Sequence, residues 1–328
     1  MQNFKAIEVY EENDGVYYQL KDITHEKLSS GDVEIKIAYS SINYKDMLAV
    51  QKGGGVIRSY PMIPGIDLSG TIVKSDDSRF HVGQEVLVTG FEMGMSHTGG
   101  FAEYARIPGK WIVPLPENLT LKEAMIIGTA GFTAALSILA LKKNGMTIDS
   151  NSEILVTGST GGVGSIAVKI LSSMGFQNIH ALVRKSNQVE VAKDLGATNI
   201  VDVKELANFN KLLAKPRYHY ILDTVGGDIA SSLIPQLHYG GSMSLCGNAA
   251  GIKLDTTVLP FILRGVTLLG IDSVYYPINS RQKVWELFAN NWKIVDELKV
   301  QEITLEEIPA IIDDIKQGKH LGRTIIKI

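Results

Sequence analysis

The spacing of apolar and polar positions changes near residue 160, where a short apolar run meets a glycine-rich turn. After the turn, apolar residues recur at the i, i+3, i+4, i+7 spacing of one helix face: Val163, Ile166, Ala167, Ile170, Leu171 and Met174. Apolar runs at 154–157 and 179–183 flank this helical pattern. The order of strand, turn, helix and strand predicts a βαβ unit.

Beyond this unit, short apolar runs continue to alternate with helical patterns. The predicted strands span 154–157, 179–183, 199–201, 219–224, 241–246 and 266–270. This alternation is typical of a parallel sheet with helices wound on both sides. We therefore predict a doubly wound α/β domain over residues 123–271.

The N-terminal part of the chain is predicted to be rich in β-structure. Apolar and polar residues alternate at 33–38, 68–73, 84–89 and 101–107, which indicates half-buried strands. The glycine-rich segment 52–64 is predicted to be a loop that borders a ligand site.

The two ends of the α/β domain are marked by helical patterns. One or two helices are predicted at 121–141, before the domain, and helical patterns at 280–290 and 305–316 follow it. An alternating strand at 324–328 ends the chain and is predicted to return to the β-rich part. Residues 1–122 and 272–328 are therefore expected to form a second domain.

The glycine turn carries the clearest chemistry. Glycines at 158, 161 and 164 permit a sharp turn and expose backbone N–H groups, and the positive end of the helix dipole faces the same point. A pyrophosphate satisfies both features, so the sequence predicts dinucleotide binding, with a purely structural strand-to-helix turn as the alternative. The residues expected to contact the dinucleotide are Gly158, Thr160, Gly161, Gly162, Val163 and Gly164.

The end of the second strand indicates which dinucleotide is bound. Folds specific for NAD place Asp or Glu about 20 residues past the glycine turn, where the carboxylate binds the ribose 2′-hydroxyl. This chain has Arg184, Lys185 and Ser186 there and no carboxylate. Two cations and a hydroxyl suit the 2′-phosphate of NADPH, with a solvated basic turn as the alternative.

Composition sets wider bounds. The 328 residues are 45% hydrophobic and 20% charged, with a net charge of −3, so no basic surface for nucleic acid is expected. The N-terminus lacks the apolar core of a signal peptide, and no apolar run is judged long enough to span a membrane. The single cysteine, Cys246, suits a reducing compartment, and a cytoplasmic protein is expected.

Several motifs together resemble one enzyme family. Short-chain dehydrogenases have a similar glycine turn near the N-terminus, and a Tyr-x-x-x-Lys pair follows it. Here the turn lies some 150 residues into the chain, and the only such spacing, Tyr17 with Lys21, precedes it. This order excludes the short-chain dehydrogenases. The chain instead resembles the zinc-free medium-chain dehydrogenases/reductases, and within them the subfamily of acryloyl-CoA reductases and quinone oxidoreductases. The segments that carry the resemblance are 41–46, 61–70, 128–135, the glycine turn, 223–227, 260–273 and 322–324.

The resemblance implies a GroES-like catalytic domain followed by a Rossmann domain. Zinc enzymes of this fold place Cys where the chain has Asn43 and a His-Glu pair where it has Ile66-Asp67, so no metal is expected. It also implies that Tyr44, the candidate catalytic residue, lies beside the nicotinamide. Further cofactor contacts implied by the family are Asn248, Ile262, Ser273, Lys319 and Arg323.

The implied activity is a zinc-independent hydride transfer from NADPH to an electron-poor C=C bond conjugated to a carbonyl. The expected reaction converts acryloyl-CoA to propanoyl-CoA, with Lys52, Arg58 and the glycines between them receiving the coenzyme A arm. Reduction of a quinone by NADPH is the alternative, and a non-catalytic nucleotide- or RNA-binding role is a third. The apolar strand at 266–271 is predicted to pair two copies into a homodimer.

Overall fold

The computed structural model describes residues 3–148, 151–206 and 212–328, and it divides into two compact units. Unit 1 comprises residues 1–129, 273–295 and 299–328, and unit 2 comprises residues 130–272 and 296–298. The division falls seven residues after the domain border expected at 122–123. It lies inside helix α2 (Leu121–Lys143), next to Gly128, whose backbone is not helical (φ 53°, ψ −162°).

Unit 2 contains a six-stranded sheet with the order β10-β9-β8-β11-β12-β13, in which every neighbouring pair is parallel. The strands are β8 (Ile154–Val156), β9 (Ile179–Val183), β10 (Asn199–Asp202), β11 (Tyr218–Asp223), β12 (Leu237–Leu245) and β13 (Thr267–Gly270). This strand order is that of the Rossmann fold and confirms the predicted doubly wound sheet.

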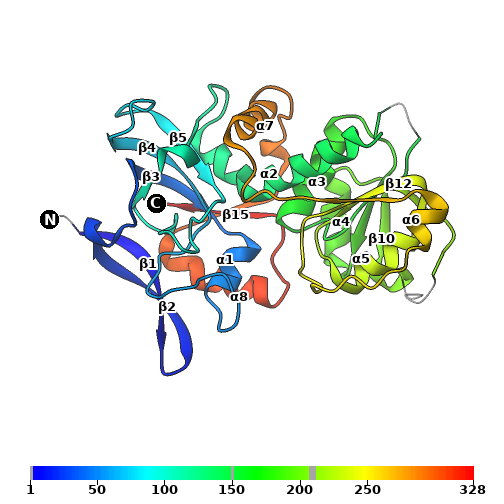
Figure 1. Ribbon diagram of the computed structural model, residues 1–328, viewed down its shortest axis with the longest axis horizontal. Helices are drawn as coiled ribbons and strands as arrows, with labels where there is room; N and C mark the ends of the chain where they lie inside the picture. The colour runs from blue at the N-terminus through cyan, green and yellow to red at the C-terminus, as the bar shows by residue number, and fades with distance from the viewer. Residues whose placement is uncertain (1–2, 149–150, 207–211) are drawn as a thin grey trace. The chain divides into compact units, whose positions relative to one another are not determined.

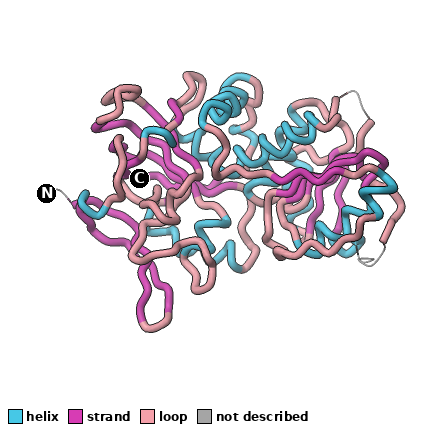
Figure 2. Tube along the Cα trace, viewed as in Figure 1, coloured by secondary structure: helices cyan, strands magenta, loops and turns pink. Residues whose placement is uncertain are grey.

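Helices lie on both sides of this sheet (Figures 1 and 2). They are α3 (Gly162–Ser173), α4 (Asn187–Asp194), α5 (Gly227–Leu233) and α6 (Leu259–Arg264). The face of α3 that carries Ile166, Ile170 and Leu171 is fully buried. The helical spacing read from the sequence therefore packs α3 onto the sheet and directs the glycine turn to the carboxyl ends of the strands.

Unit 1 is built on a sheet with the order β14-β15-β3-β4-β5-β7, with β6 paired to β3, beside a separate hairpin of β1 and β2. The strands are β1 (Asn3–Glu12), β2 (Gly15–Thr24), β3 (Val33–Ser41), β4 (Asp67–Ser75), β5 (Glu85–Thr89), β6 (Tyr104–Ile107), β7 (Val113–Pro114), β14 (Val300–Ile303) and β15 (Arg323–Lys327). Strand β15 pairs antiparallel with β3, so the end of the chain joins the sheet of its N-terminal part.

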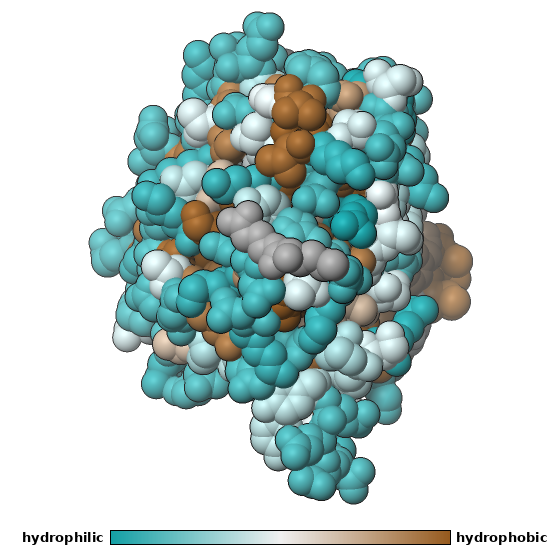
Figure 3. All heavy atoms as spheres, turned by 90° about the vertical axis from the view of Figure 1, so that its left-hand side faces the viewer, coloured by the Kyte–Doolittle hydropathy of each residue, from teal (hydrophilic) through white to brown (hydrophobic). Residues whose placement is uncertain are grey.

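Besides the first part of α2, the described residues of unit 1 include the helices α1 (Tyr44–Ala49), α7 (Ile278–Asn290) and α8 (Ile308–Lys316). The helix predicted over 305–316 consists of a 3-10 turn (Leu305–Glu307) followed by α8, which has a proline in its first turn. Trp285 and Phe288 of α7 are almost completely buried. The face seen in Figure 3 is mainly hydrophilic.

Helix α2 corrects one expectation from the sequence. It is long and apolar enough to span a membrane, and 83% of its most apolar 18-residue window is buried inside the structure. The expectation that no apolar run is as long as a membrane span was wrong, because residues 124–141 contain no charged side chain. Such burial is what a helix packed in a protein core shows.

Candidate functional site

Glycine is required at two positions of the turn that joins β8 to α3. Gly158 has φ +56°, and a Cβ there would lie 2.4 Å from Oγ1 of Thr224. A Cβ on Gly164 would lie 2.2 Å from the carbonyl oxygen of Gly158. A side chain at Gly158 would clash with the segment that follows β11, and one at Gly164 would force the turn itself apart.

The same turn leaves the start of α3 open. Gly161 precedes the helix in an extended conformation and has no side chain, and no side-chain hydrogen bond caps this end within the described part of unit 2. The turn closes on itself through the N–H of Gly161, which donates to the carbonyl of Gly158 (2.9 Å). The first N–H groups of a 12-residue helix are therefore available to an anion such as a pyrophosphate.

A buried carboxylate shapes the neighbouring strand end. Asp223, at the end of β11, accepts hydrogen bonds from Oγ1 of Thr157 (2.7 Å) and the N–H of Gly226 (2.8 Å). Burial raises the pKa of the Asp223 carboxyl. Asp223 thus joins the carboxyl ends of β8 and β11 beside the glycine turn. Sequence reasoning quoted this aspartate only as part of a motif.

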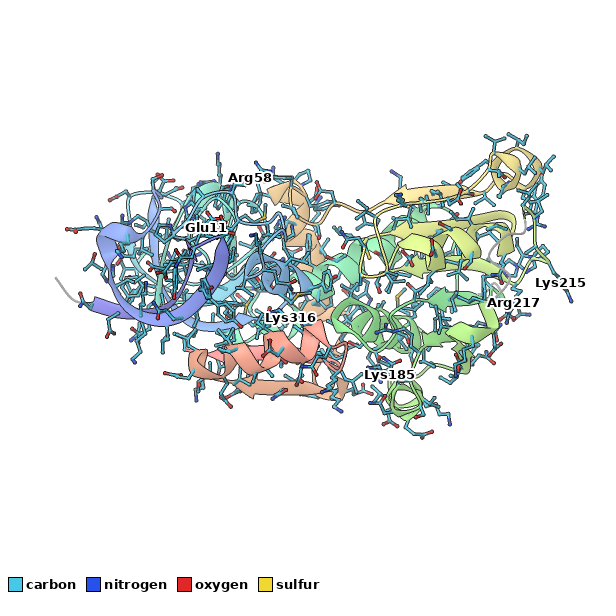
Figure 4. The ribbon with its side chains drawn as sticks, turned by 90° about the horizontal axis from the view of Figure 1, so that it is seen from below. Glu11, Arg58, Lys185, Lys215, Arg217 and Lys316 are labelled. Carbon is cyan, nitrogen blue, oxygen red and sulfur yellow. The ribbon has the colours of Figure 1, made fainter. Side chains whose placement is uncertain are left out.

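The basic turn after β9 is exposed and contains no acidic residue. Arg184, Lys185 and Ser186 are all exposed, and Lys185 lies next to the green helix α4 in Figure 4. The backbone N–H groups of Arg184 and Lys185 both donate to Oε1 of Gln188, at 2.8 and 3.1 Å. Sequence reasoning missed Gln188, although it lies within the same basic segment.

The other expected cofactor residues are distributed over both units. In unit 2, Asn248 lines a cavity of about 210 Å³ together with Gly226 and Gly247, whereas Ile262 is 69% exposed on α6. Tyr44, Ser273, Lys319 and Arg323 belong to unit 1. Tyr44 is the first residue of α1 and is 41% exposed, so its side chain is not part of the core.

Unit 1 contains a buried polar cluster centred on Asp67. Its carboxylate accepts four hydrogen bonds: from Ser41 Oγ (2.6 Å), Asn43 Nδ2 (2.8 Å), the Thr129 N–H (2.9 Å) and Thr129 Oγ1 (2.5 Å). A fully buried carboxylate needs such donors to offset its lost hydration. Through these contacts Asp67 holds the side chains of Ser41, Asn43 and Thr129 in place.

Arg323 is the cation of this cluster, and only 1% of it is exposed. Its guanidinium donates to the carbonyls of Ile126 (2.8 Å), Ile42 (3.3 Å) and Met125 (3.4 Å), to Ser41 Oγ (2.9 Å) and to Asn43 Oδ1 (3.3 Å). Each guanidinium nitrogen therefore has a protein acceptor inside unit 1. The structure gives Arg323 an organising position, and its expected contact with the cofactor remains a prediction.

Gly128 makes room for this cluster. A Cβ at Gly128 would lie 2.7–2.8 Å from Nη2 of Arg323, Oδ2 of Asp67 and Oγ of Ser41. The break in α2 at this residue is therefore tied to the cluster. The sequence left open whether one or two helices cover this segment, and it did not indicate the break at Gly128.

A second buried carboxylate, Asp46, lies beside the first. It accepts hydrogen bonds from the N–H groups of Asn43 (2.8 Å) and Ile66 (3.0 Å). Burial, followed by the nearby charge of Asp67, raises the pKa of Asp46 to about 7. Asp46 also ties the first turn of α1, where Tyr44 lies, to the start of β4.

Within the described ranges, no group of three or more His, Cys, Asp or Glu side chains is placed to hold a metal ion. The Asn43 carboxamide is engaged with Asp67 and Arg323, and Ile66 is a buried apolar side chain. Neither offers the thiolate or imidazole that zinc prefers. Independence from zinc stays a prediction that these residues support.

A Rossmann unit with an open glycine turn, together with a β-rich unit built around a buried polar cluster, defines a dehydrogenase of the two-domain, nucleotide-dependent class. Sequence profiles agree: the alcohol dehydrogenase GroES-like domain matches residues 29–117 and the zinc-binding dehydrogenase domain matches residues 162–290. The chain belongs to the medium-chain dehydrogenase/reductase family, in the group of acrylyl-CoA reductases and quinone oxidoreductases.

Three relatives illustrate this membership. "Putative quinone oxidoreductase YhfP" of Bacillus subtilis is 45% identical over 99% of both chains, and its crystal structure with NAD bound has a TM-score of 0.95. The acrylyl-CoA reductase AcuI of Ruegeria pomeroyi is 38% identical, with 100% of this chain and 99% of that protein covered. The yhdH oxidoreductase from Salmonella enterica, in complex with NADP, has a TM-score of 0.95 at 40% identity over 99% of both chains.

Proposed function

We propose that this chain is an NADPH-dependent reductase of a C=C bond conjugated to a carbonyl, with acryloyl-CoA as its substrate and propanoyl-CoA as its product. The observation that carries the proposal is the pair of turns in unit 2: an open glycine turn, and a basic turn of exposed Arg184 and Lys185 without a carboxylate. The Salmonella relative with bound NADP supports the same cofactor.

The residues present suit such a reaction. When bound at the glycine turn, NADPH would supply a hydride for the β-carbon of the substrate, and negative charge would then develop on the carbonyl oxygen. Hydrogen-bond donors fixed in advance stabilise that charge, and the α-carbon then needs a proton. We assign this proton to the Tyr44 hydroxyl or to solvent, with Asn43 and Asp46 fixing the helix turn that carries Tyr44.

The coenzyme A arm is assigned to the segment that follows Tyr44. Hydrogen bonds from Ser96 and Tyr275, and then the positive charges of Arg58 and Lys45, lower the pKa of the Glu92 carboxyl. Arg58 and Lys45 thus both lie near Glu92, where two cations accompany one carboxylate, and Lys52, the other cation expected here, is exposed on the same segment. Between them, Gly53 and Gly55 have positive φ and open space around them. A phosphate of coenzyme A would find excess positive charge at this point.

Reduction of quinones is the second candidate, favoured by the name of the Bacillus subtilis relative. A quinone lacks the phosphates and the pantetheine arm, so it gains nothing from Lys45 or Arg58. The deciding measurement is kcat/KM with NADPH for acryloyl-CoA, crotonyl-CoA and a small benzoquinone. Faster turnover of a thioester is expected, and a quinone that wins by more than tenfold would replace the thioester proposal.

A non-catalytic RNA-binding role is the remaining alternative. The net charge of −3 argues against it, because RNA binding depends on neutralising phosphates with Lys and Arg. A gel-shift assay with AU-rich RNA at rising salt tests it. Salt-sensitive binding at submicromolar protein would favour that role over catalysis.

We also propose that the protein is a cytoplasmic homodimer paired through β13. Strand β13 is the edge of the six-stranded sheet, and an uncovered edge strand invites pairing with another chain. Nearby α6 and the segment before it expose Val258 (66%), Ile262 (69%) and Leu263 (54%). Two such edges related by a two-fold axis would form one continuous sheet. Light scattering that finds a monomer at micromolar concentration would contradict this.

A further inference from the structure

Gln188 fixes the basic turn of unit 2 through its side chain. This residue lies in the first turn of α4, and its Oε1 accepts hydrogen bonds from the N–H groups of Arg184 (2.8 Å) and Lys185 (3.1 Å). The N–H of Gln188 donates to the carbonyl of Lys185 (3.0 Å). Three hydrogen bonds therefore hold the segment from 184 to 188 in one shape.

The chemical type of this acceptor is informative. A carboxylate would accept the same two N–H groups more strongly than an amide does, because charge-assisted hydrogen bonds are the stronger ones. Hydrogen bonding alone therefore gives no reason for glutamine. The difference between the two is charge: the amide oxygen leaves the turn positive, whereas a carboxylate would neutralise half of it.

The neighbouring acidic residue on α4 does not cancel this charge. Glu190 pairs with Lys193 one turn along the same helix (2.8 Å), and both are exposed. Arg184, Lys185 and Ser186 are all exposed, and the side chain that holds the backbone of this turn is neutral.

We infer that Gln188 is a specificity-determining residue for the cofactor: it shapes the turn with an uncharged oxygen, so that position 188 adds no negative charge beside a 2′-phosphate on the ribose. The inference rests on the proposed function, in which a nicotinamide dinucleotide occupies the glycine turn. Gln188 acts through Arg184 and Lys185, so it is a positioning residue and not a catalytic one.

Gln188→Glu tests the inference because it keeps the acceptor oxygen and nearly the same shape while it adds one negative charge. By calorimetry, the Kd of 2′,5′-ADP is expected to rise about tenfold, while the Kd of 5′-AMP is unchanged. In turnover, kcat/KM for NADPH should fall by a similar factor, while kcat/KM for NADH stays the same.

Gln177→Glu is the matched control. Gln177 is exposed and lies just before β9, whereas Gln188 lies after the other end of this strand, so the control adds the same charge away from the turn. An equal loss of 2′,5′-ADP affinity in the control would overturn the inference, because it would reveal a general effect of net charge.

A second variant separates the position of the acceptor from its charge. Gln188→Met removes the acceptor and adds no charge, so the freed turn should lose part of its preference for 2′,5′-ADP over 5′-AMP. Unchanged preference in both Gln188→Met and Gln188→Glu would overturn the inference. A wild-type protein that does not prefer NADPH over NADH would instead contradict the cofactor part of the proposed function.

Discussion

Arg323 and Asn43 are joined in the interior of unit 1, where Nη1 of the arginine lies 3.3 Å from Oδ1 of the asparagine. They are 280 positions apart in the chain. The carboxamide also donates to Asp67, so a single neutral side chain bridges the buried cation and a buried carboxylate. Zinc-dependent dehydrogenases of this fold place a cysteine at the position of Asn43. In this chain, hydrogen bonds between side chains occupy that place instead.

From this relationship we expect the purified protein to hold no stoichiometric zinc and to keep its activity in a chelator. The Asn43 carboxamide is already engaged, and Ile66 offers no ligand atom. Elemental analysis before and after dialysis against EDTA, with turnover measured on both samples, checks this. One tightly held zinc ion per chain would contradict it.

Replacing Arg184 with Ala is expected to erode the preference for NADPH over NADH. One charge-assisted contact to a phosphate contributes roughly 1.5–3 kcal/mol, or about one to two decades in affinity. The measurement is the ratio of kcat/KM for the two cofactors. Lys142→Ala, which removes an exposed cation at the end of α2, is the control and should leave the ratio unchanged. A constant ratio in the Arg184 variant would contradict the assignment.

Gly128→Ala is expected to destabilise the protein strongly. An alanine at this position would have to keep a positive φ, and its Cβ would lie only 2.7–2.8 Å from atoms of Arg323, Asp67 and Ser41. We expect these two effects to lower the free energy of unfolding by about 2–4 kcal/mol. Gly83→Ala is the control, because Gly83 also has positive φ but open space around it, and about 1 kcal/mol is expected there. Equal costs in denaturant titrations would show that the cluster gives way easily.

Two buried groups of unit 1, Asp46 and His320, should make the free energy of unfolding depend on pH in opposite directions. Burial and the Asp67 charge raise the pKa of Asp46 to about 7, so its contribution is lost as the pH rises from about 4 through 7. Burial and the Arg323 charge lower the pKa of His320 to about 4, so its contribution is lost as the pH falls from about 6.5 through 4. The two slopes largely cancel between pH 4 and 6.5.

Single variants should uncover each slope. Asp46→Asn removes the falling contribution, so its unfolding free energy should rise with pH more steeply than that of the wild type, by about 1.4 kcal/mol per pH unit at most. His320→Gln should give the opposite trend. Denaturant titrations at several pH values measure this, and a constant offset from the wild type at every pH would refute the assigned pKa shifts.

The sequence predicted those features that depend on residues close together in the chain. The glycine turn, the helix face of α3 and the six parallel strands follow from local spacing, and they appear at the expected places. The β1–β2 hairpin was missed, although Asn13 and Asp14, both with positive φ, precede Gly15 in a sequence typical of hairpin turns.

The buried cluster could not be predicted in the same way. It assembles Ser41, Asn43, Asp67, Thr129 and Arg323 from four distant segments. Spacing within any one segment carries no information about the others. The family resemblance pointed to Asn43 and Asp67 and to hydrogen bonding by Asp67, but not to its partners Ser41 and Thr129 or to Arg323 as the buried cation. Asp46 and Gln188 were missed because their roles depend on backbone N–H groups, which no side-chain motif records.

The last prediction separates the two halves of a coenzyme A substrate. If Lys45 and Arg58 attract its phosphates, the double variant Lys45→Ala/Arg58→Ala should lose about tenfold or more in kcat/KM for acryloyl-CoA. It should lose nothing for acryloyl-pantetheine, which has the same reacting group and no nucleotide. Lys36→Ala/Lys110→Ala, which removes two exposed cations elsewhere in unit 1, is the control. Because binding energy from a remote arm positions the reacting group, the loss should appear partly in kcat and not only in KM. Equal losses for both thioesters would place the phosphates elsewhere and leave Lys45 and Arg58 as supports of the fold.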